Sequence, residues 1–184
     1  MRALHLLVTE WHSTPQERMA AWPCDHVLSD ADAALFRAVD VRAPVAVVFR
    51  WLCQLRVAPY SYDLIDNLGR RSPRALTPGL DDLAIGQRVM TIFELVGFDR
   101  DNHITMRSTR ALFGDVAVTY RVRTAGGGTR LTVKLLVRHR RDPLGIVMSK
   151  VLPVGDLVMM RKQLRTIAAL AQRETRRDRT VNEG

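Results

Sequence analysis

Apolar and polar residues alternate with a period of two over several stretches of the chain, which is the pattern of β-strands that bury one face. The three glycines at 126–128 separate two of these stretches and predict a hairpin loop. We therefore expect an antiparallel sheet. Its strands are predicted at residues 36–42, 88–98, 103–109, 116–124 and 129–139.

A long amphipathic helix is predicted to follow these strands, because apolar residues recur at helical spacing from 142 to 174. Pro153 and Gly155 lie inside this stretch and are expected to kink the helix or break it into two pieces. A single amphipathic helix after an antiparallel sheet has to lie on that sheet to bury its apolar stripe. If the sheet curves around the helix, the space between them is an apolar pocket.

Shorter helices are predicted in the first third of the chain. Residues 44–55 place apolar side chains on one helical face, and residues 60–69 form a second short amphipathic segment that a glycine ends. Nearer the N-terminus, Thr14 and Glu17 have the spacing of a capping box, which predicts a helix from 15 to about 21.

These elements suggest three parts of the chain. Residues 1–33 form an N-terminal extension with a short helix, and Trp11 and Trp22 are expected to hold that helix to the main body. Residues 34–175 form the main domain. Residues 176–184 are basic and polar, and we expect a disordered tail there.

Several local motifs and their order carry a resemblance to a known family. The segments concerned are 37–44, 48–52, Tyr60-Ser61-Tyr62-Asp63 with Asn67-Leu68, Leu83-Ala84-Ile85-Gly86, and the helix residues Asp156, Met159, Arg161, Leu164 and Ile167. Together they resemble a bacterial branch of the START-like superfamily, also called SRPBCC or polyketide cyclase/dehydrase-like. The resemblance covers residues 11 to 174.

This resemblance implies an α+β helix-grip fold. In that fold a curved antiparallel sheet of about six to seven strands wraps around a long C-terminal helix, and two short helices follow the first strand. It also implies a cavity for a small molecule beneath the helix. Part of the superfamily catalyses cyclase or dehydratase reactions on polyketides, so the resemblance admits an enzyme as well as a binding protein.

Charge adds a second possibility to this interpretation. The chain has 184 residues and a formal net charge of +9, and 25 of its 28 basic residues are arginine. Such a balance can indicate a nucleic acid or an anionic membrane as partner. The arginines are scattered, however, and no predicted helix carries a basic stripe with aromatic residues between, so a nucleic-acid partner is disfavoured.

Other residue types exclude several classes of site. Cys24 and Cys53 are far apart and belong to no metal motif, so two free thiols are expected. The five histidines are scattered, and no glycine motif for a nucleotide is present. We therefore predict no metal and no cofactor. No apolar run is long enough to cross a membrane, which favours a cytoplasmic protein; a homodimer is left open.

The alternation in the predicted strands assigns side chains to an inner face toward the helix. Met106, Val118, Tyr120 and Leu135 belong to this face and are candidate ligand-binding residues. Tyr120 could donate a hydrogen bond to a ligand, or it could be a core tyrosine whose hydroxyl reaches the rim of the sheet.

Further candidates lie on the two predicted helical regions beside the pocket. Tyr60, Tyr62 and Asp63 would either contact a polar group of the ligand at the pocket mouth, or pack and cap their own helix. Met148 and Met159 on the long helix would either line an adaptable cavity or belong to the ordinary core.

Glu94 and His139 are the candidate catalytic residues. Glu94 lies among apolar residues, where a carboxylate with a raised pKa could serve as acid or base; it could equally pair with Arg107 or Arg121 across the sheet. His139 ends an inward row and could exchange protons near neutral pH, although three arginines beside it are typical of a surface strand end.

The hypothesis that best unites these observations is binding of a hydrophobic small molecule, such as a lipid, polyketide or aromatic metabolite, between the sheet and the C-terminal helix. The alternative is a polyketide cyclase or dehydratase that uses the same cavity. A basic module for nucleic acid or anionic membrane is the third hypothesis.

Overall fold

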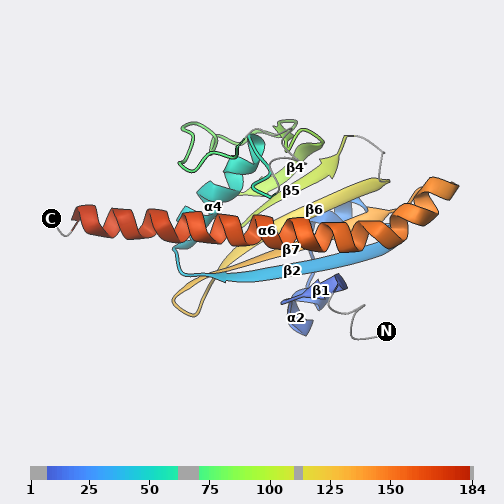
Figure 1. Ribbon diagram of the computed structural model, residues 1–184, viewed down its shortest axis with the longest axis horizontal. Helices are drawn as coiled ribbons and strands as arrows, with labels where there is room; N and C mark the ends of the chain where they lie inside the picture. Colours follow the sequence, from blue (N-terminus) through green and yellow to red (C-terminus); the bar gives the residue numbers. More distant parts are fainter. Residues whose placement is uncertain (1–7, 62–70, 110–113, 183–184) are drawn as a thin grey trace.

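The computed structural model describes residues 8–61, 71–109 and 114–182, and it shows an α+β protein with one open, curved sheet of seven strands (Figure 1). The strand order is β1-β2-β7-β6-β5-β4-β3, and every neighbouring pair is antiparallel except β1 with β2. The strands are β1 (Glu10–Trp11), β2 (Ala33–Val41), β3 (Arg88–Val89), β4 (Phe93–Asp99), β5 (His103–Ser108), β6 (Asp115–Ala125) and β7 (Gly128–Arg138).

The centre of the sheet agrees with the alternation in the sequence. Strands β6 and β7 pair over their whole lengths, from Asp115 opposite Arg138 to Ala125 opposite Gly128. Gly126 and Gly127 form the loop between them, and both have positive φ angles. A two-residue hairpin loop with this backbone needs glycine-like residues, which explains why the glycine run ends one strand and begins the next.

One predicted strand is two strands in the structure. We expected a single strand over 88–98, but the chain turns at Met90 and Thr91, which have positive φ angles, so β3 and β4 form a short hairpin. A register shift between Leu95 and Gly97 interrupts the pairing of β4 with β5. The simple alternation expected over residues 88–98 therefore fails here.

A single helix closes the described chain. Helix α6 (Pro143–Asn182) runs along one face of the sheet, and its C-terminal end extends beyond the sheet (Figure 1). Of the two outcomes expected at Pro153 and Gly155, a kink or a break, the break does not occur, because the helix continues through both residues; α6 bends toward its N-terminal end. The prediction of disorder from 176 is wrong for the residues up to Asn182, which are helical.

The first short helix after β2 lies beside α6. It comprises α4 (Val45–Cys53), which is followed by the 3-10 helix η1 (Gln54–Arg56). Five consecutive residues from Trp51 to Leu55 are buried, because α4 packs between α6 and the sheet. The second helix that we predicted, at 60–69, falls mostly outside the described residues.

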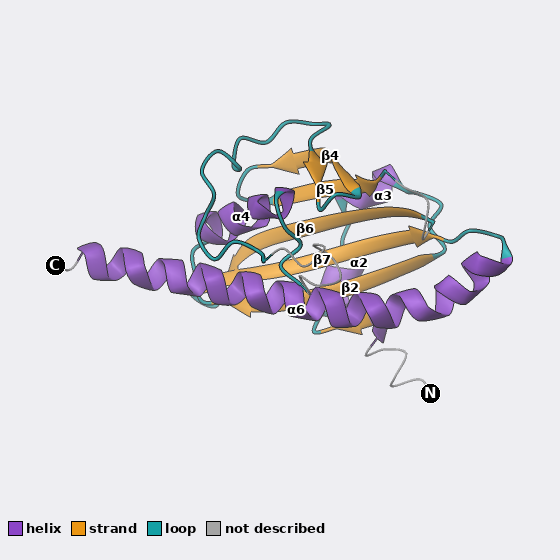
Figure 2. Cartoon of the chain, turned by 45° about the horizontal axis from the view of Figure 1, so that its top comes forward, coloured by secondary structure: helices purple, strands orange, loops and turns teal. Residues whose placement is uncertain are grey.

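The N-terminal extension covers the opposite face of the sheet (Figure 2). It contains α2 (Pro15–Met19) and α3 (Pro23–Val27). The predicted capping box is confirmed: the Thr14 hydroxyl accepts from the Glu17 backbone N–H, and Glu17 Oε2 accepts from that of Thr14. Trp11 and Trp22 are both buried, and a second short helix, which we did not predict, begins at Pro23.

Both cysteines are free, as predicted, and both are buried. Burial raises the pKa of the Cys53 thiol to about 12 and also raises that of Cys24. Thiols of this kind stay protonated at neutral pH and are poor nucleophiles. Neither cysteine is therefore a candidate for chemistry.

Candidate functional site

The face of the sheet that lies toward α6 and α4 is apolar and deeply buried. The predicted inward rows of β5, β6 and β7 contribute most of their apolar residues to this core, and α6 contributes the facing residues. The sheet residues are Leu95, Ile104, Met106, Val118, Tyr120, Val122, Leu131 and Val133, and those of α6 include Met160, Leu164, Ile167 and Ala171. Polar groups in such surroundings are uncommon and each needs an explanation.

A buried ion pair joins the sheet to the helix. Arg37 lies on β2, and its Nη2 donates to Oδ2 of Asp156 on α6 at 2.7 Å. The two side chains are 1% and 10% exposed. Burial raises the pKa of the Asp156 carboxyl to about 6, and the nearby guanidinium offsets that rise only in part.

A second polar group lies on the same face. The Tyr120 hydroxyl donates to Gln163 Oε1 at 2.6 Å, and Gln163 Nε2 donates to the Pro59 carbonyl oxygen at 2.6 Å. The sulfur of Met160 lies 3.5 Å from the hydroxyl. Burial raises the pKa of Tyr120, and the negative charge of Asp156 raises it further. The hydroxyl therefore remains a neutral hydrogen-bond donor.

Replacing Tyr120 with phenylalanine is expected to lower the free energy of unfolding by about 1–3 kcal/mol, because the buried amide oxygen of Gln163 loses its donor. Chemical denaturation of the two proteins measures this difference. An unchanged unfolding free energy would mean that the Gln163 oxygen finds another donor in the variant.

The other predicted ligand-binding residues divide by their place. Met106 and Val118 are fully buried on the inner face of the sheet. Tyr60, which follows η1, is also buried, and its ring centroid lies 6.0 Å from that of Trp51. Two further candidates are half-buried, Leu135 and Met159. Tyr62, Asp63 and the side chain of Met148 lie outside the described part of the structure.

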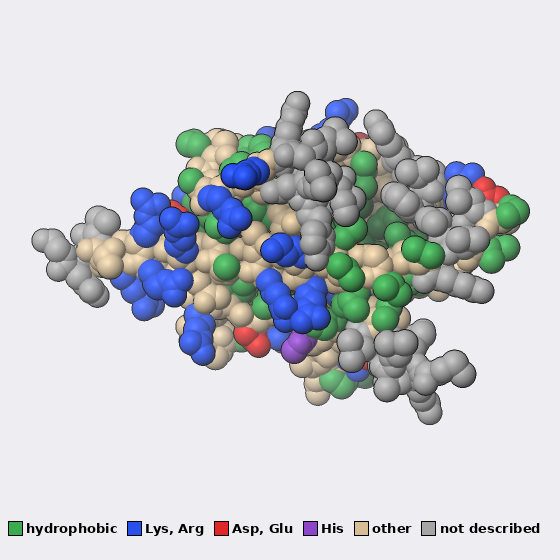
Figure 3. Space-filling model, viewed as in Figure 1, with side chains coloured by type: hydrophobic (Ala, Val, Ile, Leu, Met, Phe, Trp, Pro, Cys, Tyr) green, Lys and Arg blue, Asp and Glu red, His purple; other side chains and the backbone are tan. Residues whose placement is uncertain are grey.

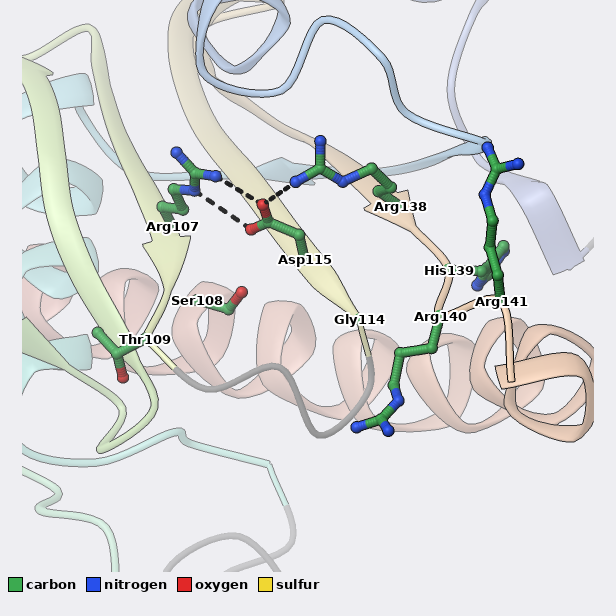
Figure 4. A pocket seen from close by; sticks show the side chains of 9 residues that line it. All are labelled: Arg107, Ser108, Thr109, Gly114, Asp115, Arg138, His139, Arg140 and Arg141. Atoms are coloured by element: carbon green, nitrogen blue, oxygen red, sulfur yellow. Dashed lines mark hydrogen bonds and ion pairs between the residues drawn. The ribbon is translucent and has the colours of Figure 1, made fainter. Parts of the chain in front are cut away.

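The structure does not bring the two candidate catalytic residues together. Glu94 is exposed on β4, directly opposite Arg107 on β5, which is the cross-strand neighbour that the sequence offered as one alternative. His139 follows β7 and lines a pocket of about 530 Å³ at the ends of β5, β6 and β7 (Figure 4). Glu94 is not part of the lining of this pocket.

Salt bridges dominate this strand-end pocket. Arg107 from β5 and Arg138 from β7 converge on Asp115 at the start of β6, with shortest distances of 2.6 and 2.7 Å (Figure 4). Hydrogen bonds from Arg107 hold the pKa of Asp115 below its usual value. Asp115 is therefore ionised and already bound, and the pocket resembles a structural network more than an acid–base pair.

A second, larger groove lies between α6 and the chain segments around Tyr60 and Arg74. Its volume is about 820 Å³. Tyr60 and Leu170 form apolar parts of its wall, whereas basic side chains dominate the rest. Its inner wall is shared with the core, since Tyr60 and Leu170 are both core residues.

Comparisons with known proteins bear on the fold. No family model matches the chain, and no curated protein matches its sequence. Among solved structures, the Zhui aromatase/cyclase from Streptomyces sp. R1128 has a TM-score of 0.50 and 15% identity, over 76% of this chain and 93% of that one. The protein TTHA0849 from Thermus thermophilus has a TM-score of 0.50 and 15% identity, over 77% and 99%.

The chain has a helix-grip fold. The resemblance that the sequence motifs suggested is thus confirmed for the architecture: a curved sheet, a long C-terminal helix and short helices after the first strand of the main body. At these levels of sequence identity, the structural likeness supports the fold and does not indicate a ligand.

Two kinds of feature are absent from the described residues. None of the helices in residues 8–61, 71–109 and 114–182 is long and apolar enough to cross a membrane. Over the same residues, no group of three or more His, Cys, Asp or Glu side chains is placed to hold a metal ion.

The most unusual residues of this helix-grip interior were not among our predicted site residues. Arg37, Asp156 and Gln163 were each visible in the sequence as a polar residue on an otherwise apolar face of a strand or helix. A single cation on a strand and a single carboxylate on a helix that must pack on that strand form a signal that could have paired them.

Proposed function

We propose that this protein binds a hydrophobic small molecule, such as a lipid, polyketide or aromatic metabolite, in a cavity between the sheet and α6. Met106, Val118, Tyr120, Leu135 and Met159 are the residues proposed to contact it. Burial of apolar surface would supply most of the affinity, and a few polar groups would orient the ligand.

The observation that carries this proposal is the set of polar groups inside the apolar core. Within the described residues, Trp51 Nε1 and Arg37 Nε are buried donors without a hydrogen-bond acceptor. Such donors weaken a fold unless water or a ligand satisfies them. Together with the Tyr120–Gln163 and Arg37–Asp156 pairs, they support a cavity that accepts polar atoms of a mainly apolar ligand.

The second candidate function is a polyketide cyclase or dehydratase. The favouring observation is Asp156, whose pKa of about 6 would let it exchange protons near neutral pH beside the Tyr120 hydroxyl. The name aromatase/cyclase of the Zhui structure agrees with this alternative. Glu94 and His139 lie apart from each other, so they are poorer candidates for an acid–base pair in such an enzyme.

Calorimetric titration with decan-1-ol, a neutral apolar probe, tests the binding function. We expect saturable binding with a negative heat-capacity change, because apolar surface is buried. Leu135→Trp should weaken binding about tenfold by filling the space beside α6. Thr124→Trp, which adds the same ring at the exposed end of β6, is the control and should leave binding unchanged. Absence of saturable binding of both decan-1-ol and its carboxylate analogue decanoate to the unaltered protein would contradict the proposal.

Mass spectrometry of the purified protein, native and then denatured, separates the two functions. A binding protein should release a co-purified apolar molecule unchanged. An enzyme should instead convert a linear polyketide mimic over time, and Asp156→Asn should abolish that conversion without abolishing binding.

A further inference from the structure

Among the described residues, five basic side chains line the groove between α6 and the segments around Tyr60 and Arg74, and we call this the basic groove. Arg74 comes from the loop before β3, and the other four come from one side of α6 at helical spacing: Arg161, Lys162, Arg165 and Arg173. All five are exposed. Figure 3 shows lysine and arginine side chains gathered over this C-terminal half of α6.

No described carboxylate of the protein compensates the charges of the basic groove. No described carboxylate lines the groove, and among the described residues none of its five cations is in an ion pair. Arginines on the sheet behave differently. Arg37, Arg107, Arg130 and Arg138 each bind a carboxylate of this chain.

Two of these cations also lie close enough to repel each other. Arg161 and Arg165 are four residues apart on α6, a spacing at which like charges destabilise a helix. The guanidinium groups of both lie over the ring of Trp11, at 6.0 and 5.8 Å from its centroid. The ring of Trp11 therefore holds two of the positive charges of the groove close together, where an anion would relieve their repulsion.

The wall of the groove suggests what kind of anion would bind there. Tyr60 is 1% exposed, lines the groove and contacts Trp51 in the core. Leu170 likewise belongs to both the groove and the core. A ligand could thus place its charged group among the five cations while its apolar part points toward the interior.

A nucleic acid fits these observations less well. Single-stranded nucleic acids need exposed aromatic rings on which bases stack. The two aromatic residues beside the cations, Trp11 and Tyr60, are 8% and 1% exposed. A small amphipathic anion needs no such platform.

We infer that the ligand of this protein is an amphipathic anion, an apolar molecule with one carboxylate or phosphate group, and that the basic groove holds this group. This inference rests on the proposed binding function and adds the charge of the ligand. Arg74, Lys162 and Arg173 form its polar contacts, with Arg161 and Arg165 beside them.

The test compares three probes by calorimetry at constant ionic strength: decanoate, decan-1-ol and acetate. Decanoate has the chain and the charge, decan-1-ol has only the chain, and acetate has only the charge. We expect decanoate to bind at least about tenfold more tightly than either of the others. The double variant Lys162→Gln/Arg173→Gln should bind decanoate about five- to tenfold more weakly, because it lacks two partly exposed ion pairs with the carboxylate. Its affinity for decan-1-ol should be unchanged.

The control is Arg42→Gln/Arg50→Gln, which removes the same charge from exposed positions outside the groove and should leave decanoate binding intact. Equal binding of decanoate and decan-1-ol would overturn the inference and keep the binding function. Equal binding of acetate and decanoate would also overturn it, because a site for bare anions has no use for an apolar part. Failure of both ten-carbon probes would overturn the inference and the binding function together.

Discussion

Replacing the buried pair Arg37 and Asp156 together with Met and Leu is expected to raise the free energy of unfolding at pH 7 by about 1–4 kcal/mol. Both ionic groups are nearly excluded from water, with side chains 1% and 10% exposed. The raised pKa of Asp156 shows that desolvation outweighs the attraction of Arg37 for the ionised carboxylate. An apolar pair of similar volume avoids that desolvation.

The same substitution should also change the pH dependence of stability. The pKa of Asp156 is about 6 in the folded protein, against an ordinary value of 3.8. Its stabilising contribution is therefore fully present below pH 3.8 and is lost as the pH rises through 6, a loss of about 3 kcal/mol. Denaturant unfolding between about pH 4 and 7 should show this loss in the unaltered protein and not in Arg37→Met/Asp156→Leu.

The single variant Arg37→Met is the control for this pair. It leaves Asp156 buried without its partner, so at pH 7 it should be about 3 kcal/mol less stable than the double variant. If the double variant were less stable than the unaltered protein, the pair would be a net stabilising element of the fold. If it is the more stable, as we expect, the retention of the pair supports a role in the site.

Replacing Glu17 with glutamine is expected to destabilise the protein by about 2–3 kcal/mol. The Glu17 carboxylate is 5% exposed and accepts from Arg123 at 2.8 Å and from Arg130 at 2.9 Å, besides capping α2. Glutamine keeps the shape of the side chain, but it carries no charge for the two guanidinium groups. The N-terminal extension should then separate more easily from the outer face of the sheet.

The pH dependence of this contribution has the opposite sign to that of Asp156. Despite its burial, hydrogen bonds and the charges of the arginines lower the pKa of Glu17 from 4.5 to about 2. Its stabilisation is present above pH 4.5 and is lost as the pH falls toward 2. Acid unfolding should show this loss in the unaltered protein and less of it in Glu17→Gln.

Glu10→Gln is the matched control for Glu17. Glu10 pairs with Arg18 at 3.2 Å, but the two side chains are 29% and 25% exposed. This pair should contribute no more than about 1 kcal/mol, as solvated ion pairs do. Equal effects of Glu10→Gln and Glu17→Gln would contradict the special role of the buried carboxylate.

The sequence predicted the elements whose signal is local. Alternation over β5, β6 and β7, the glycine hairpin at Gly126 and Gly127, and the capping box of Thr14 all agree with the structure. Each depends on neighbours within a few residues, so chain order alone carries the information. The inward apolar rows follow from the same alternation.

The failures share a physical cause. Pro153 removes one backbone hydrogen bond of α6, but this local loss did not break the helix, which packs against β2 and α4. The chain turns at Met90 and Thr91 with positive φ angles, which neither residue type favours, so the sequence does not indicate this turn. In both cases tertiary packing outweighed local preference.

The sequence by itself determined the antiparallel sheet, the long helix that packs on it and the apolar inner face, because hydrophobic periodicity and turn residues are properties of consecutive positions. The helix-grip architecture was what the family resemblance implied. Only the tertiary structure decided the chemistry of the interior and of the groove. Arg37 and Asp156 are 119 residues apart, and Tyr120 and Gln163 are 43 apart. Which residues form such pairs depends on which faces meet when the helix packs on the sheet, and the burial of these residues then shifts their pKa values. The lack of a described carboxylate beside Lys162 and Arg173 depends on the same packing.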